Sequence, residues 1–326
     1  MSNNSFPKSL NTDTKQKRKV KELVQSHFDF AAKTVRASAI QGCFSKTFEV
    51  MLVTGKEIIM QLRIEPLDVK PFIEAQRLLG PYVPDIEKIE DAELDDAGVW
   101  PFHMTRISGK TWLENSNRWV DDLHIKCATS LGKVLTGCFM PGESKAVVDA
   151  DIVPKLKRVL ELKRPDVQAF FPKINELLHD VAQLYRLPLF YTHLDPNSMN
   201  IMVRDDGEVS GIIDWELAYG PWPFSILCSS IQFLAGFITG GKFHERQAFD
   251  PMEMGFWKEI VDGAPPEAKV AIESNWEAVQ TSVTIGTILA VFEGDDGVVN
   301  RVVLANLPKL LTYKIPALRG SALPYS

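Results

Sequence analysis

The sequence predicts an α+β fold in two lobes, a small N-terminal lobe built on an antiparallel sheet and a larger, mainly helical C-terminal lobe. Two observations predict this division. β-rich runs joined by a short Gly-containing turn lie in the first third of the chain, and amphipathic helical patterns dominate beyond residue 108. A chain of 326 residues can bury a core in each of two lobes. We expect an N-terminal extension with a helix at 1–37, the N-terminal lobe at 38–107 and the helical lobe at 108–326.

In the N-terminal part, a change of hydrophobic period separates an expected helix from an expected hairpin. Apolar residues between Val20 and Val35 fall at helical spacing. The runs Thr47–Val53 and Glu57–Ile64 are rich in β-forming residues and are joined by "TGK", which predicts a β-hairpin. A short helix is then expected to end near Gly80, which precedes a proline.

The larger lobe is expected to be helical except for one hairpin. Amphipathic patterns predict helices over 112–138, 143–186 and 222–313. The hairpin joins Asn200–Val203 to Val209–Ile213 through an Asp-Asp-Gly turn.

Composition excludes several classes of protein. The formal net charge of −6 gives no global attraction to nucleic acid or to an anionic membrane, although a local phosphate pocket is compatible with it. No uncharged apolar run of eighteen residues predicts a membrane span, and the polar N-terminus has no signal-peptide core, so we expect a cytoplasmic protein. The basic run "KQKRK" fits a solvated helix start better than a nuclear address. Four scattered cysteines without a C-x-x-C pair predict neither a cysteine zinc site nor a disulfide framework.

One segment, "YTHLDPNSMNIMVRDDGEVSGIIDWE" (191–216), concentrates polar side chains at one end of the second hairpin. His193, Asp195 and Asn200 come just before its first strand, and Asp214 ends the second. The oxygen atoms of Asn200 and Asp214 suit Mg²⁺, which proteins hold with few ligands of their own. Asp195 is then left to accept a hydrogen bond from a hydroxyl group. These are the parts that phosphoryl transfer needs.

A purely structural interpretation of the same residues is open. Asn and Asp are common in turns because they bond their own backbone, and Asp214 could cap a helix beginning near Trp215. This interpretation does not explain why three separate positions converge on one end of one hairpin.

The motif H-x-D-x-x-x-x-N, followed by "GIIDWE", resembles the aminoglycoside phosphotransferase and choline kinase branch of the protein-kinase-like fold, in a fungal-type member. The resemblance implies a kinase that uses ATP, with GTP as the alternative, and Mg²⁺ to phosphorylate a small-molecule hydroxyl. It implies that Asp195 is the catalytic base, that Asn200 and Asp214 hold Mg²⁺, and that His193 supports the loop. Asp-Trp-Glu in place of D-F-G, and the absence of A-P-E, disfavour a protein substrate.

The resemblance also implies phosphate-binding residues in the N-terminal lobe. Gly42 and Ser45 lie where the nucleotide-covering turn is expected, although a single glycine also fits a plain hairpin turn. Arg63 stands where the family usually has Lys, and it can bind phosphate in a bidentate way. Its expected acidic partner is Glu74, with Glu65 as the competitor.

The adenine base is expected to meet backbone groups between Met104 and Arg106, in "WPFHMTRISGKTWLE". The acceptor is expected beyond Asp214, beside aromatic residues or beside the acidic loop Glu293–Asp296. Such aromatic residues are more often core than pocket, and such a loop is more often simply exposed. The aromatic and acidic candidates after Asp214 are Glu216, Tyr219, Trp222 and Phe224. A catalytically silent kinase-like module that binds a nucleotide or metabolite is the alternative function, because the glycine turn is weak and Arg63 departs from the family.

Overall fold

The computed structural model describes residues 6–39, 41–42, 44–116, 118–193, 195–293, 298–299 and 301–319. Contacts within the chain divide it into two units, Met1–Ile107 and Ser108–Ser326. Each unit is described by itself below. In the described part of the chain, no helix has both the length and the apolar character needed to cross a membrane.

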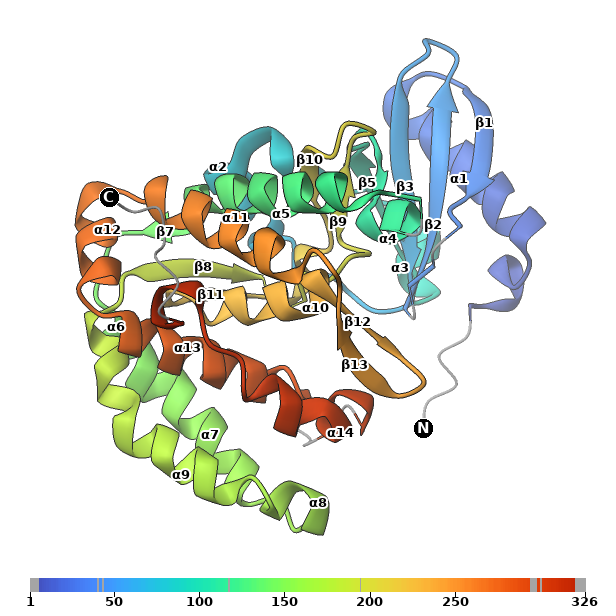
Figure 1. Cartoon of the computed structure of the whole chain (residues 1–326). Coiled ribbons are helices and arrows are strands. Elements are labelled where there is room, and N and C mark those ends of the chain that lie inside the picture. Colours follow the sequence, from blue (N-terminus) through green and yellow to red (C-terminus); the bar gives the residue numbers. More distant parts are fainter. Residues whose placement is uncertain are drawn as a thin grey trace. The chain divides into compact units, whose positions relative to one another are not determined.

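The first unit is built on a five-stranded antiparallel sheet (Figure 1). The hairpin predicted from the "TGK" turn is confirmed, with every second side chain of its two strands buried over most of their length. In spatial order the strands are β1 (Ala32–Ala37), β2 (Ser45–Leu52), β3 (Glu57–Arg63), β5 (Trp100–Thr105) and β4 (Ile86–Lys88).

Helix α1 (Asp13–Phe28) packs on this sheet and closes the core of the first unit. Its N-terminus is capped by Thr12, whose hydroxyl oxygen accepts a hydrogen bond from the Lys15 amide. Its buried residues join one hydrophobic cluster with those of β2 and β3. That cluster includes Val20, Leu23, Val24, Phe48, Val50, Ile58, Met60 and Leu62. The helices α2 (Lys70–Leu79), which was expected, and α3 (Ala92–Asp96) complete the unit.

The expectation of a helix through Val35 was wrong in its second half. Asp29 adopts the left-handed conformation, with φ of 55°, and this ends α1. The chain then forms strand β1, in which Val35 is aligned with Val50 of β2. Pairing along the sheet edge outweighs the helical spacing of the apolar residues there, and β-branched residues favour the strand.

The second unit is mainly helical, as predicted, but its helices are shorter and more numerous than the three long patterns suggest. In Figure 1, α5 and α11 lie side by side, and they make the most extensive helix–helix contact in the described part of this unit. The helices are α4 (Trp112–Ser116), α5 (Asp121–Leu135), α6 (Ser144–Val147), α7 (Val153–Leu160), α8 (Pro165–Gln168), α9 (Phe171–Asp180), α10 (Ile231–Ala235), α11 (Phe249–Asp262), α12 (Pro266–Glu273), α13 (Trp276–Leu289) and α14 (Arg301–Leu310).

Short strands carry the polar segment of the second unit. The predicted second hairpin is confirmed as β9 (Ile201–Val203) and β10 (Val209–Ile212), with β6 (Lys110–Thr111) added beside β9. A separate three-stranded sheet, which was not predicted, places β8 (Leu189–His193) between β11 (Ala218–Pro223) and β7 (Phe139–Met140). The remaining hairpins are β12 (Gly236–Thr239) with β13 (Lys242–Glu245), and β14 (Phe292–Glu293) with β15 (Val298–Val299).

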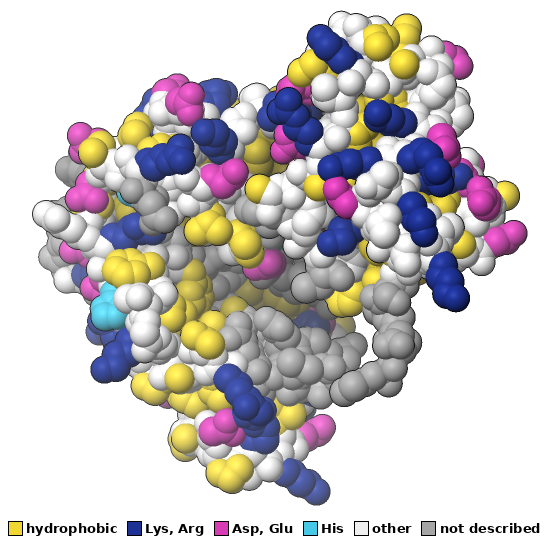
Figure 2. All heavy atoms as spheres, turned by 90° about the vertical axis from the view of Figure 1, so that its right-hand side faces the viewer, with side chains coloured by type: hydrophobic (Ala, Val, Ile, Leu, Met, Phe, Trp, Pro, Cys, Tyr) yellow, Lys and Arg dark blue, Asp and Glu magenta, His cyan; other side chains and the backbone are white. Residues whose placement is uncertain are grey.

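The surface carries charges of both signs. Figure 2 shows Lys and Arg side chains interspersed with Asp and Glu side chains over the coloured part of one face. This mixture accompanies the formal net charge of −6.

The close packing of α5 on α11 depends on Gly132. A Cβ atom at this position would overlap the backbone carbonyl oxygen of Phe256 in α11. Gly132→Ala is therefore expected to destabilise the protein by about 1 to 3 kcal/mol, although alanine is intrinsically the better helix former. Denaturant unfolding measures this difference. Gly220→Ala is the control, because no atom lies within 4 Å of the added Cβ; equal stability of the two variants would contradict the packing interpretation.

Candidate active site

Two neighbouring strand ends assemble the polar residues of the 191–216 segment. His193 is the last residue of β8, and the loop from Asp195 to Asn200 leads directly into β9. Strand β10 runs antiparallel to β9, with Ile212 aligned with Ile201, so the chain beyond β10 returns to the start of β9.

Ile213 connects the three segments through its two backbone groups. Its amide donates a hydrogen bond of 2.9 Å to the carbonyl oxygen of Asn200. Its carbonyl oxygen lies 2.9 Å from Nε2 of His193. Asp214 is the next residue, so its backbone is fixed beside both the Asn200 and the His193 positions. The predicted convergence of His193, Asn200 and Asp214 on one end of this hairpin is a feature of the structure.

His193 has a supporting position rather than a reacting one. The ring is buried and Nδ1 accepts a hydrogen bond of 3.1 Å from the amide of Asp195. Burial lowers the pKa of His193, so the ring is neutral near pH 7. A neutral ring that accepts at Nδ1 must donate from Nε2 to the Ile213 carbonyl, which fixes its tautomer. The edge of this ring packs on Trp215, with a centroid distance of 4.7 Å.

Asn200 is oriented by Asp195. Its side-chain nitrogen donates a hydrogen bond of 2.9 Å to the Asp195 carbonyl oxygen, and it lies 3.4 Å from Oδ2 of the same residue. Because both partners are acceptors, the amide nitrogen must face them. The side-chain oxygen is then directed away from Asp195, and no described residue donates a hydrogen bond to it. An oxygen ligand for a hard cation is therefore available at Asn200.

Asp214 is exposed and adopts the left-handed conformation, with φ of 66° and ψ of 51°. Few residues other than glycine adopt this conformation, and those that do are concentrated at functional sites. The helical turn that begins at Trp215 receives no side-chain hydrogen bond from Asp214, so the helix-cap interpretation is wrong. The turn interpretation does hold at Asn197, whose side-chain oxygen accepts a hydrogen bond of 2.7 Å from the Met199 amide.

In the first unit, the turn before β2 is held by a residue that the sequence analysis missed. The Gln41 side chain donates to the carbonyl oxygens of Ser38 and Thr47, and its oxygen accepts from the Thr47 amide at 2.9 Å. Gly42 is exposed within this turn, and Ser45 is buried at the start of β2. The Gln41 side chain therefore holds the backbone on both sides of this turn, and no spacing rule would have pointed to Gln41.

Arg63 and Glu74 occupy different elements of the first unit. Arg63 is buried at the end of β3, where it is aligned with Ser45 and donates a hydrogen bond of 3.2 Å to Gln61. Glu74 accepts two hydrogen bonds from Arg77, one turn later in α2, and this contact lowers the pKa of Glu74. The carboxylate is therefore engaged within its own helix. The predicted pairing of Glu74 with Arg63 stays a prediction.

The segment that is expected to bind adenine begins within β5, which lies between β3 and β4 in the sheet. Met104 lies inside β5, aligned with Ile59 of β3 and Ile86 of β4. Arg106 follows the end of the strand, and its guanidinium forms an ion pair of 2.7 Å with Glu57. Arg106 is thus better placed than Met104 to offer the adenine base backbone groups that lie outside the strand pairing.

The comparisons with known proteins agree with this geometry. Residues 102–224 match the model of the phosphotransferase enzyme family, and the matched range contains the whole 191–216 segment. The resemblance to the phosphotransferase family is confirmed. None of the curated proteins compared with the chain matches it.

Solved structures of phosphotransferases share the fold of this chain. The Plasmodium vivax ethanolamine kinase has a TM-score of 0.55 at 11% identity, covering 92% of this chain and 89% of its own. A macrolide 2′-phosphotransferase from Brachybacterium faecium has a TM-score of 0.53 at 15% identity, covering 84% and 91%. An aminoglycoside phosphotransferase in complex with AMP-PNP and hygromycin B has a TM-score of 0.53 at 11% identity, covering 83% and 97%. At these identities the likeness establishes the fold alone: the predicted two-lobed, α+β protein-kinase-like fold is confirmed.

Burial shows which aromatic residues near Asp214 belong to the core. Trp215 and Phe224 have no exposed surface, and Phe224 packs against Phe139 and Phe190. Trp222 is buried as well, and its indole nitrogen donates a hydrogen bond of 2.5 Å to Asp151 beside a shallow hollow of about 340 Å³. The core interpretation therefore holds for these three. Most of the acidic loop Glu293–Asp296 lies outside the described residues.

Proposed function

We propose that this protein is an ATP- and Mg²⁺-dependent phosphotransferase that transfers the γ-phosphate to a hydroxyl group of a small molecule. The observation that carries the proposal is the pair of hydrogen bonds at Ile213, which joins the His193, Asn200 and Asp214 positions. Nucleic acid and membrane lipids are not among the expected partners.

The contacts of His193, Asp195 and Asn200 support the following roles. Asp195 is exposed, and its backbone is anchored by His193 and Asn200, so its carboxylate can accept the proton of a bound hydroxyl. The side-chain oxygens of Asn200 and Asp214 would hold Mg²⁺, which would neutralise charge on the phosphate oxygens. His193 is a positioning residue, because both nitrogens of its neutral ring are already engaged in hydrogen bonds with backbone groups.

In the first unit we assign nucleotide contacts to Gly42, Ser45 and Arg63 around the phosphates, and to the Met104–Arg106 backbone around the base. The alignment of Ser45 with Arg63 across β2 and β3 supports grouping these two. The substrate class is drawn from the relatives: the fold is shared with an ethanolamine kinase and with enzymes named for aminoglycoside and macrolide phosphorylation. An amino alcohol or a hydroxylated secondary metabolite is the acceptor that we would test first.

A silent kinase-like module is the second candidate. The observation in its favour is the engagement of Glu74 by Arg77, together with an arginine at position 63. Such a module would bind nucleotide or metabolite without turnover.

Asp214→Asn tests the metal assignment. Asparagine tolerates the left-handed conformation, so the backbone should be kept while one negative ligand is lost. In the wild type, ATP with Mg²⁺ at about a hundred times the dissociation constant should add about 2.7 kcal/mol of stability and raise the melting temperature by a few degrees. The variant should lose most of this shift.

Thermal melts with ATP alone, Mg²⁺ alone and both components measure this effect. The control is Asp205→Asn, an exposed residue at the opposite end of the same hairpin, which should behave like the wild type. An unchanged requirement for Mg²⁺ in Asp214→Asn would remove Asp214 from the metal site.

A further inference from the structure

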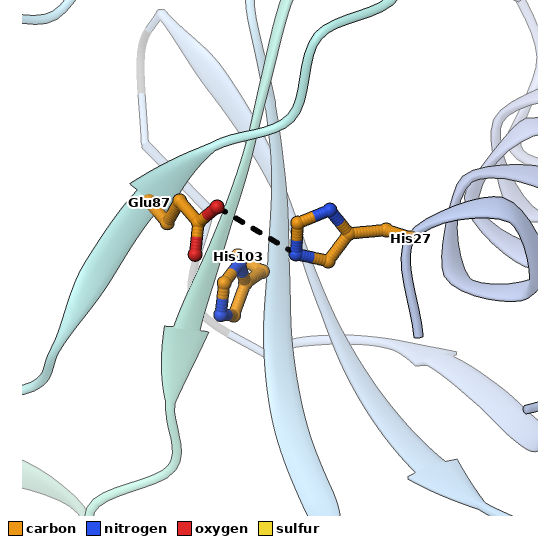
Figure 3. A group of neighbouring side chains, drawn as sticks. All are labelled: His27, Glu87 and His103. Atoms are coloured by element: carbon orange, nitrogen blue, oxygen red, sulfur yellow. Dashed lines mark ion pairs between the residues drawn. The ribbon is translucent and has the colours of Figure 1, made fainter. Parts of the chain in front are cut away.

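A second group of metal-binding side chains lies in the first unit, on the sheet rather than in the 191–216 segment. Glu87 of β4 and His103 of β5 are direct cross-strand partners, so their side chains leave the same face of the sheet. His27 lies in the last turn of α1 and reaches this pair from the helix (Figure 3).

The three side chains are close enough to bind one ion. Each offers one ligand atom, and these atoms lie within 4.8 Å of one another. The His27 Nε2 atom lies 4.0 Å from a carboxylate oxygen of Glu87, and the two imidazole rings have a centroid distance of 5.0 Å. Ligand atoms around a tetrahedral Zn²⁺ are roughly 3.4 Å apart, so the three ligand atoms must approach one another by about 1 Å to bind the ion. Glu87 is 63% exposed and has room for such a movement.

The environment of His103 provides an independent indication. Its Nδ1 atom is buried and has no hydrogen-bond partner in the described part of the structure. A buried polar nitrogen without a partner is costly, and coordination to a metal ion is one way to satisfy it.

We propose that His27, Glu87 and His103 bind a divalent transition-metal ion, with Zn²⁺ as the expected ion. Two imidazole nitrogens with one carboxylate suit Zn²⁺ and its neighbours in the transition series, whereas Mg²⁺ prefers oxygen ligands throughout. Three protein ligands leave one position for water. The ion fastens the C-terminal end of α1 to β4 and β5, and it stabilises the first unit independently of nucleotide.

Binding of Zn²⁺ to the metal-free, full-length chain tests the proposal by calorimetry. The wild type should bind one ion, and His27→Gln and Glu87→Gln should each weaken binding at least about tenfold, because each removes one of three ligands. His179→Gln and Glu90→Gln are matched controls at exposed positions and should bind as the wild type does. Equal affinity in all five proteins, or no binding to the wild type, would overturn the proposal.

A thermal melt gives a second readout that does not depend on activity. Zn²⁺ should raise the melting temperature of the wild type by a few degrees, and EDTA should reverse this shift. The shift should be lost in His27→Gln and retained in Asp214→Asn, which separates this site from the candidate active site. A Zn²⁺ shift that persists in His27→Gln would place the ion elsewhere.

Discussion

Asp195→Asn is expected to lower the rate of phosphoryl transfer by about 10² to 10⁴-fold, the range that a positioned general base contributes. This loss corresponds to about 2.7 to 5.5 kcal/mol of activation free energy. Asparagine has the same shape as aspartate but cannot take up the proton of the acceptor hydroxyl. The loop should keep its conformation, because His193 and Asn200 hold the Asp195 position mainly through its backbone amide and carbonyl groups.

Nucleotide binding should survive this substitution, since Asp195 is assigned to the acceptor and not to the metal. Release of ADP from ATP and Mg²⁺, measured with a panel of amino alcohols and aminoglycosides, reports turnover; the ATP-dependent melting shift reports binding. Asp205→Asn serves again as the exposed control. A parallel loss of turnover and binding would contradict the assigned role, and a wild type that binds ATP without turnover on any acceptor would favour the silent module.

The candidate active site could be predicted because its parts are close in the sequence. His193 and Asp214 are separated by one hairpin, and antiparallel pairing alone returns the second strand end to the first. The tautomer of His193 and the role of Ile213 could not be predicted, because backbone atoms make these contacts and leave no mark on residue type.

The sheet of β7, β8 and β11 shows where sequence patterns fail. All five residues of β8 are buried, so the strand has no alternation of apolar and polar positions. Strand β11 contains Gly220, Pro221 and Pro223, which predict turns rather than a strand. Strands β8 and β11 form because they pair with each other across a long stretch of the sequence.

The partners of charged side chains could not be predicted from the sequence pattern either. Glu74 could have met several cations, and the structure pairs it with the arginine one helical turn away. His27, Glu87 and His103 come from a helix and two strands, and only the fold of the first unit brings them together.

Arg319→Met is expected to destabilise the protein by about 3 to 5 kcal/mol at pH 8, because it leaves a buried carboxylate without its cation. Glu253 of α11 has no exposed surface, and both of its oxygens accept hydrogen bonds from the Arg319 guanidinium. Tyr313 lies against the same guanidinium and also contacts Trp257. The pair thus anchors the C-terminal segment to the core of the second unit.

The destabilisation should depend on pH with a defined sign. Burial raises the pKa of Glu253 to about 7 from a usual value near 4.5, and Arg319 opposes this shift. A raised carboxyl pKa means that the folded state binds more protons, so stability falls as pH rises from about 4.5 through the folded pKa. Without Arg319 the pKa of Glu253 rises further, so the pH range over which stability falls extends to higher pH. The variant should therefore be closer to the wild type at pH 5 than at pH 8.

Urea unfolding at pH 5 and pH 8 measures this difference. Arg18→Met is the matched control, because its partner Glu22 and the arginine itself are both exposed and the pair is worth little. The double variant Arg319→Met/Glu253→Met separates the two causes of instability: removing both charges should recover much of the loss at pH 8, since no buried carboxylate remains. A double variant as unstable as Arg319→Met, with no dependence on pH, would show instead that lost packing of the arginine side chain causes the effect.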